Sequence, residues 1–415
     1  MTSFYDALET RAPAEREAAH LAALPTQVAH ARTHSSAFAA ILAGVDPALV
    51  TSRAALARLP VTRKHELLER QQAERSHDVF GGFATVGFGA AMPRVFASPG
   101  PIYEPEGTRR DYWRMARAMH AAGFQAGELI HNCFSYHFVP AGSMMESGAH
   151  ALGCTVFPGG TGQTEQQVQA MADLRPAGYI GTPSFLKLIV EKAQEMRVPL
   201  PSVTKALLSA EAFPPSLRDW FAERGITGYQ CYGTADLGLI AYETAAREGL
   251  VMDEGVIVEI VRPGTGDPVP EGEVGELVIT TLNTDYPLIR FGTGDLSAIL
   301  PGTCPTGRTN TRIKGWMGRA DQTTKVRGLF VHPGQVASIT SRFPQVLRAR
   351  LIVRGEMAND QMVLQVETTE TAGGLAPRLQ DAIREVTKLR GEVELVAPGT
   401  LPNDGKVIED ARSYR

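Results

Sequence analysis

Short apolar runs alternate with helix-like segments through much of the N-terminal half of the chain, and this alternation limits the folds open to it. Two expected strands, Tyr179–Gly181 and Ala206–Leu208, flank Phe185–Met196, which has helical spacing. A helix from Pro215 and a strand over Ile226–Cys231 continue the pattern. Parallel strands need long crossover connections, usually helices. The sequence therefore predicts an α/β fold with mainly parallel sheets covered by helices.

The pattern changes near residue 250. Val256–Val261 and Gly275–Ile279 are β-rich and are joined by a turn-rich segment, which predicts a β-rich subdomain. After Gly318-Arg319, two strand patterns, an amphipathic helix and a last strand follow, which is typical of a small α+β unit. We therefore expect a large N-terminal domain over residues 1–318 and a small C-terminal domain over residues 319–415.

Composition excludes several classes of protein. Lys and Arg number 41 against 45 Asp and Glu, a net charge of −4, so a dedicated nucleic-acid binder is not expected. No apolar run approaches the roughly 18 residues of a membrane span, and the first residues lack a signal-peptide pattern. The cysteines are far apart and form no CxxC pair, so neither disulfides nor a structural zinc site is expected. Together these features predict a cytoplasmic protein.

Four polar motifs stand out. Tyr232–Asp236 directly follows an expected strand, where open parallel sheets bind ligands, and Phe291–Asp295 places a carboxylate after a Gly-rich turn. The alternatives are a strand-to-helix turn capped by Asp236 and a plain turn. Gly318–Asp321 is equally compatible with a solvated linker, and Gly405-Lys406 with an ordinary surface lysine. None of the four is specific by itself.

In this order and at these separations, the motifs resemble the adenylate-forming (acyl-CoA synthetase) superfamily, and most closely its phenylacetate-CoA ligase branch. The resemblance runs from about residue 59 to the C-terminus. Further stretches that resemble this branch are Leu152–Val156, Gly162–Val168, Ser209–Ala212, Gly275–Leu282 and Pro287–Arg290.

The resemblance implies an AMP-forming acid–CoA ligase that uses ATP, Mg²⁺ and coenzyme A. A carboxylic acid attacks the α-phosphate of ATP, and CoA then displaces AMP from the acyl-adenylate. The resemblance also implies a homodimer and a mobile C-terminal lid. The matching nucleotide positions are Ser98, Gly100, Ala210, Glu211, Ala212, Tyr232, Gly233, Thr234, Asp295 and Arg319.

Three further positions follow from the same resemblance. Lys406 would be the catalytic lysine that bridges the reacting carboxylate and the α-phosphate. Asp236 would help to ligate Mg²⁺. Asp321 would be the hinge about which the lid rotates between the two half-reactions.

The acyl substrate is expected to border Ser135–Phe138. Tyr136 or Phe138 would pack on an aryl ring, and His137 would bind a polar substituent or the carboxylate. Alternatively these are core residues, with His137 a satisfied buried imidazole. Met144 and Met145 would either shape the same pocket or fill the core. The acid is expected to be an aryl or small organic acid.

Three departures from the family pattern bear on activity. The phosphate loop, normally rich in Ser, Thr and Gly and ending in Gly-Lys-Pro, here reads Ser98–Gly107 with Glu104 and Glu106. Its prolines remove backbone N–H donors. In addition, Ala235 stands where Ser or Thr is usual, and Asp236 replaces a Glu.

Two other functions therefore stay open beside the ligase. One is a catalytically impaired homologue that binds a nucleotide or an acyl-CoA. The other is an adenylating enzyme that passes the acyl group to an amine or a carrier protein.

Overall fold

A computed structural model describes residues 3–99, 101–320, 322, 324–326, 329–355, 360–370 and 374–412. The chain divides into two compact units. Unit 1 contains Met1–Val258, Ile279–Phe291 and Leu300–Gly315, and unit 2 contains Glu259–Val278, Gly292–Ile299 and Trp316–Arg415. The units interleave along the chain, and the division into domains over 1–318 and 319–415 stays a prediction.

The predicted α/β fold is confirmed. A nine-stranded sheet has the order β14-β15-β10-β9-β8-β7-β6-β4-β5, and all four pairings from β8 to β5 are parallel. The pairings from β8 to β15 are antiparallel. The strands are β4 (Leu129–Asn132), β5 (Thr155–Pro158), β6 (Gly178–Gly181), β7 (Lys205–Leu208), β8 (Thr227–Thr234), β9 (Gly238–Glu243), β10 (Leu250–Met252), β14 (Ile299–Leu300) and β15 (Arg312–Ile313).

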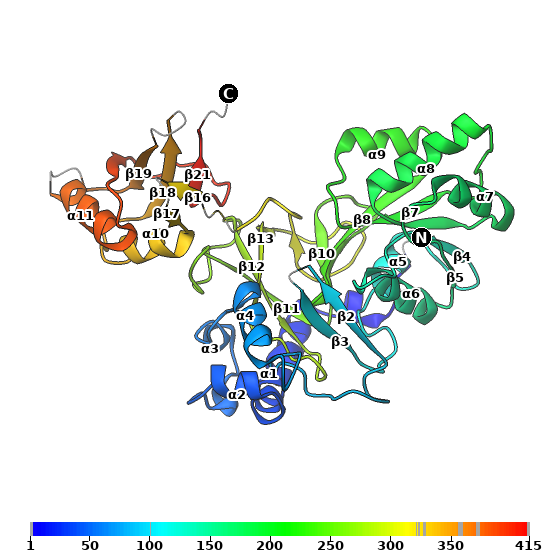
Figure 1. The fold of residues 1–415 in the computed structure, drawn as a ribbon, viewed down its shortest axis with the longest axis horizontal. Helices are drawn as coiled ribbons and strands as arrows, with labels where there is room; N and C mark the ends of the chain where they lie inside the picture. The colour runs from blue at the N-terminus through cyan, green and yellow to red at the C-terminus, as the bar shows by residue number, and fades with distance from the viewer. Residues whose placement is uncertain are drawn as a thin grey trace. The chain divides into compact units, whose positions relative to one another are not determined.

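Helices cover both faces of the parallel strands (Figure 1). Alternate residues of a strand belong to different cores: Ile180 and Leu207 pack with α5 and α6, whereas Tyr179, Ala206 and Leu208 pack with α7, α8 and α9. This alternation follows from the two-residue period of a strand. The helices are α5 (Ala116–Ala121), α6 (Ala141–Leu152), α7 (Thr164–Leu174), α8 (Pro183–Met196) and α9 (Pro215–Ala222).

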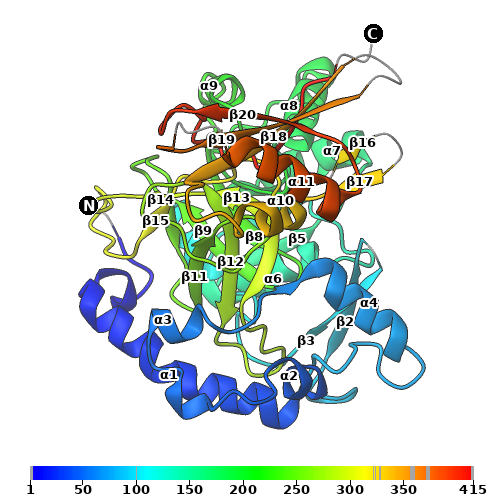
Figure 2. The same cartoon turned by 90° about the vertical axis from the view of Figure 1, so that its left-hand side faces the viewer.

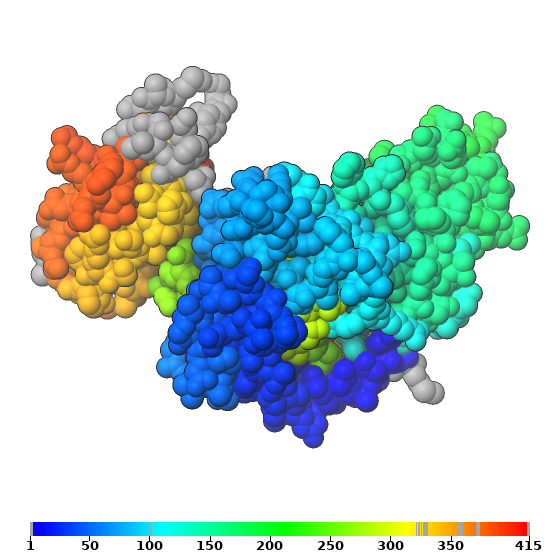
Figure 3. Space-filling view, turned by 60° about the horizontal axis from the view of Figure 1, so that its bottom comes forward, coloured from blue at the N-terminus to red at the C-terminus, as the bar shows by residue number. Residues whose placement is uncertain are grey.

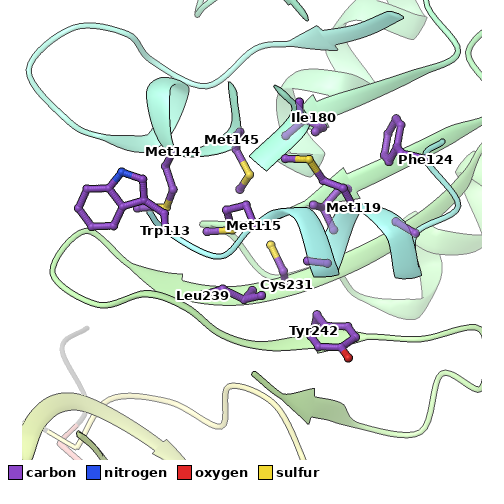
Figure 4. Close-up of a cluster of buried hydrophobic side chains, with 14 of the residues drawn as sticks. Trp113, Met115, Met119, Phe124, Met144, Met145, Ile180, Cys231, Leu239 and Tyr242 are labelled. Atoms are coloured by element: carbon purple, nitrogen blue, oxygen red, sulfur yellow. The ribbon is translucent and has the colours of Figure 1, made fainter. Parts of the chain in front are cut away.

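Methionines fill much of the core under α5 and α6 (Figure 4). Met144 is 5% exposed and Met145 is 3% exposed, and both pack with Met115 and Met119. Unbranched thioether side chains adapt to irregular gaps, which suits them to this position. Of the two interpretations of Met144 and Met145, the structure therefore supports core filling.

N-terminal helices cover one face of unit 1, beside the residues that follow them (dark and light blue in Figure 3). Proline at the first position of α1 costs no hydrogen bond, because that N–H has no helical partner. The elements are η1 (Ala7–Thr10), α1 (Pro13–His34), α2 (Ser36–Ile41), η2 (Pro47–Leu49), α3 (Arg53–Leu56) and α4 (Lys64–Glu74).

Two smaller sheets complete the first part of the chain. β2 (Arg94–Ser98) and β3 (Ile102–Glu106) form an antiparallel hairpin. A four-stranded sheet has the order β1-β13-β12-β11. Its strands are β1 (Thr62–Arg63), β11 (Val256–Val261), β12 (Gly275–Thr281) and β13 (Phe291–Ser297).

The C-terminal part of unit 2 is an α+β layer, as predicted. Its sheet has the order β20-β19-β18-β21, and α10 and α11 lie side by side against it (Figure 2). A separate hairpin joins β16 and β17. The elements are β16 (Thr324–Val326), β17 (Leu329–Val331), α10 (Pro333–Thr340), β18 (Arg348–Arg354), β19 (Gln361–Glu367), α11 (Leu375–Thr387), β20 (Glu392–Val396) and β21 (Ile408–Asp410).

Two local features differ from what the sequence pattern favours. A threonine three residues before a glutamine favours a capping box, but Thr164 is the first residue inside α7, and Gln163 caps that helix without a side-chain bond. The Gln167 amide instead donates to the carbonyl of Gly159 at 2.8 Å and bonds His131 Nε2 at 2.6 Å. The loop expected after Ser98 contains the strand β3.

Two further expectations concern disulfides and membrane-spanning helices. All four cysteines are free and buried. No helix in the described ranges is long and apolar enough to cross a membrane.

Candidate functional site

The carboxyl ends of β7 and β8 bring two predicted nucleotide segments together in unit 1. The strands are parallel neighbours, with Leu208 opposite Gln230. Directly beyond them, the Ser209 hydroxyl donates to the carbonyl of Cys231 at 2.8 Å. The turn that carries Ala210 therefore lies beside Tyr232, at the edge where parallel sheets bind ligands.

The Ala210–Ala212 turn is exposed and held in an unusual conformation. Ala210 has φ +68°, in the left-handed region that non-glycine residues rarely adopt. Glu211 accepts from the Ser184 hydroxyl at 2.9 Å and from the Ser184 backbone N–H at 3.2 Å, in the first turn of α8. These bonds anchor the turn, and the three predicted residues present an open surface next to the β8 end.

Tyr232–Asp236 forms the end of β8 and the turn into β9, so the alternative of a strand-to-helix turn is wrong. A register shift lies between Tyr232 and Gly233. A Cβ on Gly233 would lie 2.6 Å from the Gly238 carbonyl oxygen, so this close strand approach requires glycine. The Thr234 hydroxyl accepts from the backbone N–H of Leu237 at 3.2 Å and closes the turn.

Asp236 is a buried carboxylate, 4% exposed, with two different environments for its oxygens. Oδ2 pairs with Lys64 Nζ at 2.9 Å, whereas Oδ1 is buried without a hydrogen-bond partner. An unpartnered buried carboxylate oxygen is a ligand that Mg²⁺ accepts, so this residue fits the predicted metal. Among the described residues, no group of three or more His, Cys, Asp or Glu side chains forms a complete metal site.

Sequence reasoning missed Lys64. It begins α4, 172 positions from the aspartate with which it pairs. Nothing in the local pattern around Pro60–Lys64 distinguishes it from a surface lysine, since its partner is identified only by the fold.

The predicted phosphate loop is a tight β-hairpin. Ser98 ends β2 and Ile102 begins β3, which leaves three residues between the strands. Two of these are prolines without an N–H, and the third, Gly100, lies outside the described residues. Ser98 is 3% exposed, and both its hydroxyl and its backbone N–H donate to the carboxylate of Glu104, the latter at 3.2 Å.

Glu104 is fully buried, at 0% exposure. Burial, followed by the nearby negative charge of Asp236, raises the pKa of the Glu104 carboxyl to about 8. The two glutamates of this strand differ. Glu106 is buried with two donors, Arg94 Nη1 at 2.6 Å and Trp113 Nε1 at 2.9 Å.

The three predicted acyl-site residues lie in the loop between β4 and α6. The Tyr136 hydroxyl donates to Glu146 at 2.8 Å and accepts from the Asn132 amide at 2.8 Å. Burial raises the pKa of Tyr136, so its hydroxyl stays protonated. Phe138 is 82% exposed and His137 is exposed as well. The alternative that these two are core residues is therefore wrong.

Unit 2 carries Asp295, one of the predicted nucleotide-binding residues, which the family resemblance assigns to the ribose hydroxyls. Asp295 in β13 is 8% exposed, and its Oδ1 accepts from Arg319 Nη1 at 2.8 Å and from Trp316 Nε1 at 3.1 Å. Gly294 has φ +72°, and a Cβ there would lie 2.7 Å from the Arg319 guanidinium. Glycine is thus required for Asp295 and Arg319 to meet.

Lys406 is an exposed lysine on a constrained turn of unit 2. Its backbone N–H donates to Asp404 at 3.1 Å, and Gly405 before it has φ +72°. A Cβ on Gly405 would lie 2.5 Å from Val274 and 3.1 Å from Leu296, the residue after Asp295. A cavity of about 330 Å³ within unit 2 has Lys406 in its wall.

The hinge position Asp321 lies outside the described residues, but Gln322 beside it contacts the lysine turn. Its Nε2 donates to the Gly405 carbonyl at 2.9 Å, and its Oε1 accepts from the backbone N–H groups of Val407 and of Ile408, the latter at 2.8 Å. Sequence reasoning missed this residue, because an amide in a polar segment carries no signal of its own.

Comparisons with known proteins agree with this arrangement. A family model of AMP-binding enzymes matches residues 108–284. The chain is 33% identical over 344 residues to the phenylacetate-coenzyme A ligase of Thermus thermophilus. The aligned region covers 79% of this chain and 75% of that relative. It is 30% identical over 392 residues to the phenylacetate-coenzyme A ligase of Escherichia coli, and the aligned region covers 88% of this chain and 86% of that relative.

Among solved structures, an open conformation of 2-hydroxyisobutyryl-CoA ligase in complex with 2-HIB-AMP and CoA has a TM-score of 0.71 and 26% identity. The match covers 95% of this chain and 90% of that one. The protein is thus an AMP-binding, adenylate-forming enzyme. Within that class, the chain belongs to the phenylacetate-coenzyme A ligase family.

Proposed function

We propose that the protein is an AMP-forming carboxylic acid–CoA ligase. A carboxylate oxygen of the acid attacks the α-phosphorus of ATP, and the bond to the β-phosphate oxygen breaks to release pyrophosphate. The CoA sulfur then attacks the acyl carbon of the adenylate, loses its proton, and AMP departs. Both steps develop negative charge that must be stabilised in a water-poor site.

The observation that carries this proposal is the position of Lys406 in unit 2. Its turn packs on the side chain of Leu296 in β13, the strand that also carries Asp295. In the proposed site Asp295 binds the ribose hydroxyls, and the α-phosphate is attached to the same ribose. Because its turn contacts the strand that carries Asp295, we propose that Lys406 comes within range of the charge that forms at the α-phosphorus. The Lys406 ammonium would neutralise it and orient the attacking carboxylate.

In unit 1, the Ala210–Ala212 turn and Tyr232 would flank the adenine, with the Tyr232 ring as the stacking surface. Asp236 would hold Mg²⁺ through the oxygen that lacks a hydrogen-bond partner. When bound, the metal ion supplies positive charge to the phosphates. Lys64, paired with the same carboxylate, would provide a second cation for the phosphate chain.

For the acid, we propose an aryl or small organic carboxylate that lies against the Tyr136–Phe138 loop. The exposed Phe138 ring offers an apolar surface, and Tyr136 is fixed by Glu146 and Asn132. Both kinds of acid occur in the names of the relatives, one a phenylacetate-coenzyme A ligase and the other a 2-hydroxyisobutyryl-CoA ligase. We also propose that the enzyme works in the cytoplasm as a homodimer and that residues 319–415 rotate as a lid.

Pyrophosphate exchange with a panel of acids tests the proposal. The panel includes phenylacetate, benzoate and 2-hydroxyisobutyrate, and at least one acid should support exchange into ATP, followed by CoA thioester formation. Lys406→Ala should reduce exchange at least 100-fold, whereas the matched control Lys314→Ala, at another exposed lysine, should leave it unchanged. If no acid supports exchange or AMP release, the proposal is wrong.

One observation favours a second candidate, a homologue that binds nucleotide or acyl-CoA without turnover. Both Ser98 donors already bond Glu104, which leaves neither of these two groups for phosphate. Calorimetry that detects AMP or acyl-CoA binding, together with no exchange for any acid and no effect of Lys406→Ala on binding, would identify this function. An adenylating enzyme with another acceptor would show exchange but no CoA thioester.

A further inference from the structure

The β2–β3 hairpin contains its own carboxyl group at the position where the phosphate loop is expected. Its Glu104 carboxyl group accepts hydrogen bonds from the hydroxyl and from the backbone N–H of Ser98. Ser98 is the last residue of β2 and directly precedes the turn with the two prolines. Backbone N–H groups and hydroxyls of this kind are the donors with which loops bind phosphate. A carboxylate bound by both donors is therefore a chemical substitute for a phosphate oxygen pair.

The hairpin holds this glutamate firmly. The Gln71 side chain, 0% exposed, donates to the Tyr103 carbonyl at 2.8 Å and accepts from the Tyr103 N–H at 2.8 Å. On the other side of Glu104, the Glu106 carboxylate is bound by Arg94 and Trp113. Tyr103 and Glu106, which flank Glu104 in β3, are thus both held in place by hydrogen bonds. The strand therefore keeps the Glu104 side chain directed at Ser98.

We propose that Glu104 competes with the terminal phosphates of ATP for the donors of Ser98, and so determines how well the enzyme binds ATP relative to AMP. The identity of the phosphate ligand rests on the proposed function. MgATP must displace Glu104 from Ser98 before these donors can bind its pyrophosphate portion. AMP lacks that portion, so its binding leaves the Ser98–Glu104 contact intact.

Above about pH 8, where Glu104 is ionised, charge acts in the same direction. Glu104 lies close enough to Asp236 for the two carboxylates to influence each other, and both are buried. The phosphates of ATP add negative charge to the same neighbourhood, and like charges repel more strongly in a poorly hydrated site. Removing the Glu104 carboxylate should thus free two donors and remove one acidic group.

Isothermal calorimetry with the full-length protein tests this, with MgATP and AMP as separate probes and no acid or CoA present. Glu104→Ala should lower the Kd for MgATP at least tenfold and change the Kd for AMP less than twofold. In turnover assays, the KM for ATP should fall while the KM values for acid and CoA stay the same. An unchanged or higher Kd for MgATP would overturn the proposal, since Glu104 would then support the site or ligate the metal.

A double-mutant cycle identifies Ser98 as the group through which Glu104 acts. Ser98→Ala alone should change the Kd for MgATP less than twofold, whereas in the Glu104→Ala background it should remove most of the gain. A gain that persists without the Ser98 hydroxyl would overturn the assigned competition. Glu106→Gln is the matched control on the same strand and should leave the ratio of the two Kd values unchanged.

Glu104→Gln covers the case in which Glu104→Ala does not fold. The amide keeps the size of the side chain and an acceptor for Ser98 but has no charge. At pH 9, where Glu104 of the wild type is ionised, we therefore expect a smaller gain in affinity for MgATP, of about threefold. No gain in this variant would overturn the proposal. Because these binding measurements need no turnover, they can succeed even if the wild type catalyses no exchange, which would contradict the proposed ligase alone.

Discussion

Replacing Glu104 by Gln should change how the stability of the protein depends on pH. The pKa of Glu104 is about 8 in the folded protein, compared with an ordinary value near 4.5. Between these values the folded state keeps the proton and the unfolded state loses it. Stability of the wild type therefore falls as pH rises through this window, by about 1.4 kcal/mol per pH unit from this group. Glutamine has no such dependence.

The expected difference is large enough to measure. From pH 5 to pH 8, the free energy of unfolding of Glu104→Gln should gain about 4 kcal/mol relative to wild type. Below about pH 4.5 and above about pH 8, the difference should be constant. A constant offset from the altered Ser98 contact does not affect this slope, because that contact is present at every pH.

Urea denaturation at several pH values, followed by tryptophan fluorescence, provides the measurement. Trp113 reports on this region, because its indole N–H donates to Glu106 on the same hairpin. Val95→Ala on the same hairpin changes no titratable group, so it serves as the control, and its stability should run parallel to that of wild type between pH 5 and 8. If the profile of Glu104→Gln is also parallel to wild type, to within about 0.5 kcal/mol, then the assigned burial and pKa of Glu104 are wrong.

Three further predictions concern the rest of the site. Gln322→Ala removes the side-chain bonds to the Gly405 turn and should lower the kcat of exchange about tenfold with an unchanged KM for ATP, whereas a structural defect would change both. Gly294→Ala forces a Cβ against Arg319 at a positive φ, and should weaken AMP binding at least fivefold by calorimetry. Asp236→Asn should raise the Mg²⁺ concentration needed for half-maximal exchange, and an unchanged requirement would refute its assignment as a ligand.

Much of the fold could be predicted because its signals are local. The expected strand Tyr179–Gly181, helix Phe185–Met196 and strand Ala206–Leu208 correspond to β6, α8 and β7 within one or two residues. Each contains its own apolar periodicity, and the flanking prolines and glycines define its ends. The parallel order follows from the helical crossovers between the strands.

The strand β3 could not be predicted in this way. Ile102–Glu106 has two glutamates and a proline, which favour a loop in any local interpretation. It is a strand because it pairs with β2 and because Gln71, 32 positions away, bonds the backbone of Tyr103. A proline is tolerated because the sheet has only two strands.

By itself the sequence determined the fold class, the family and the residue types at the candidate site, since these depend on periodicity and motif order. Only the tertiary structure decided how the acidic groups are used. It buried Glu104 against Ser98 and paired Asp236 with Lys64, which is 172 positions away in the chain. Burial and long-range pairing change the charge and hydrogen bonding of a side chain without changing its identity. The departure in the phosphate loop is therefore visible in the sequence, but the structure shows what Glu104 does there: it bonds the donors that a phosphate would need.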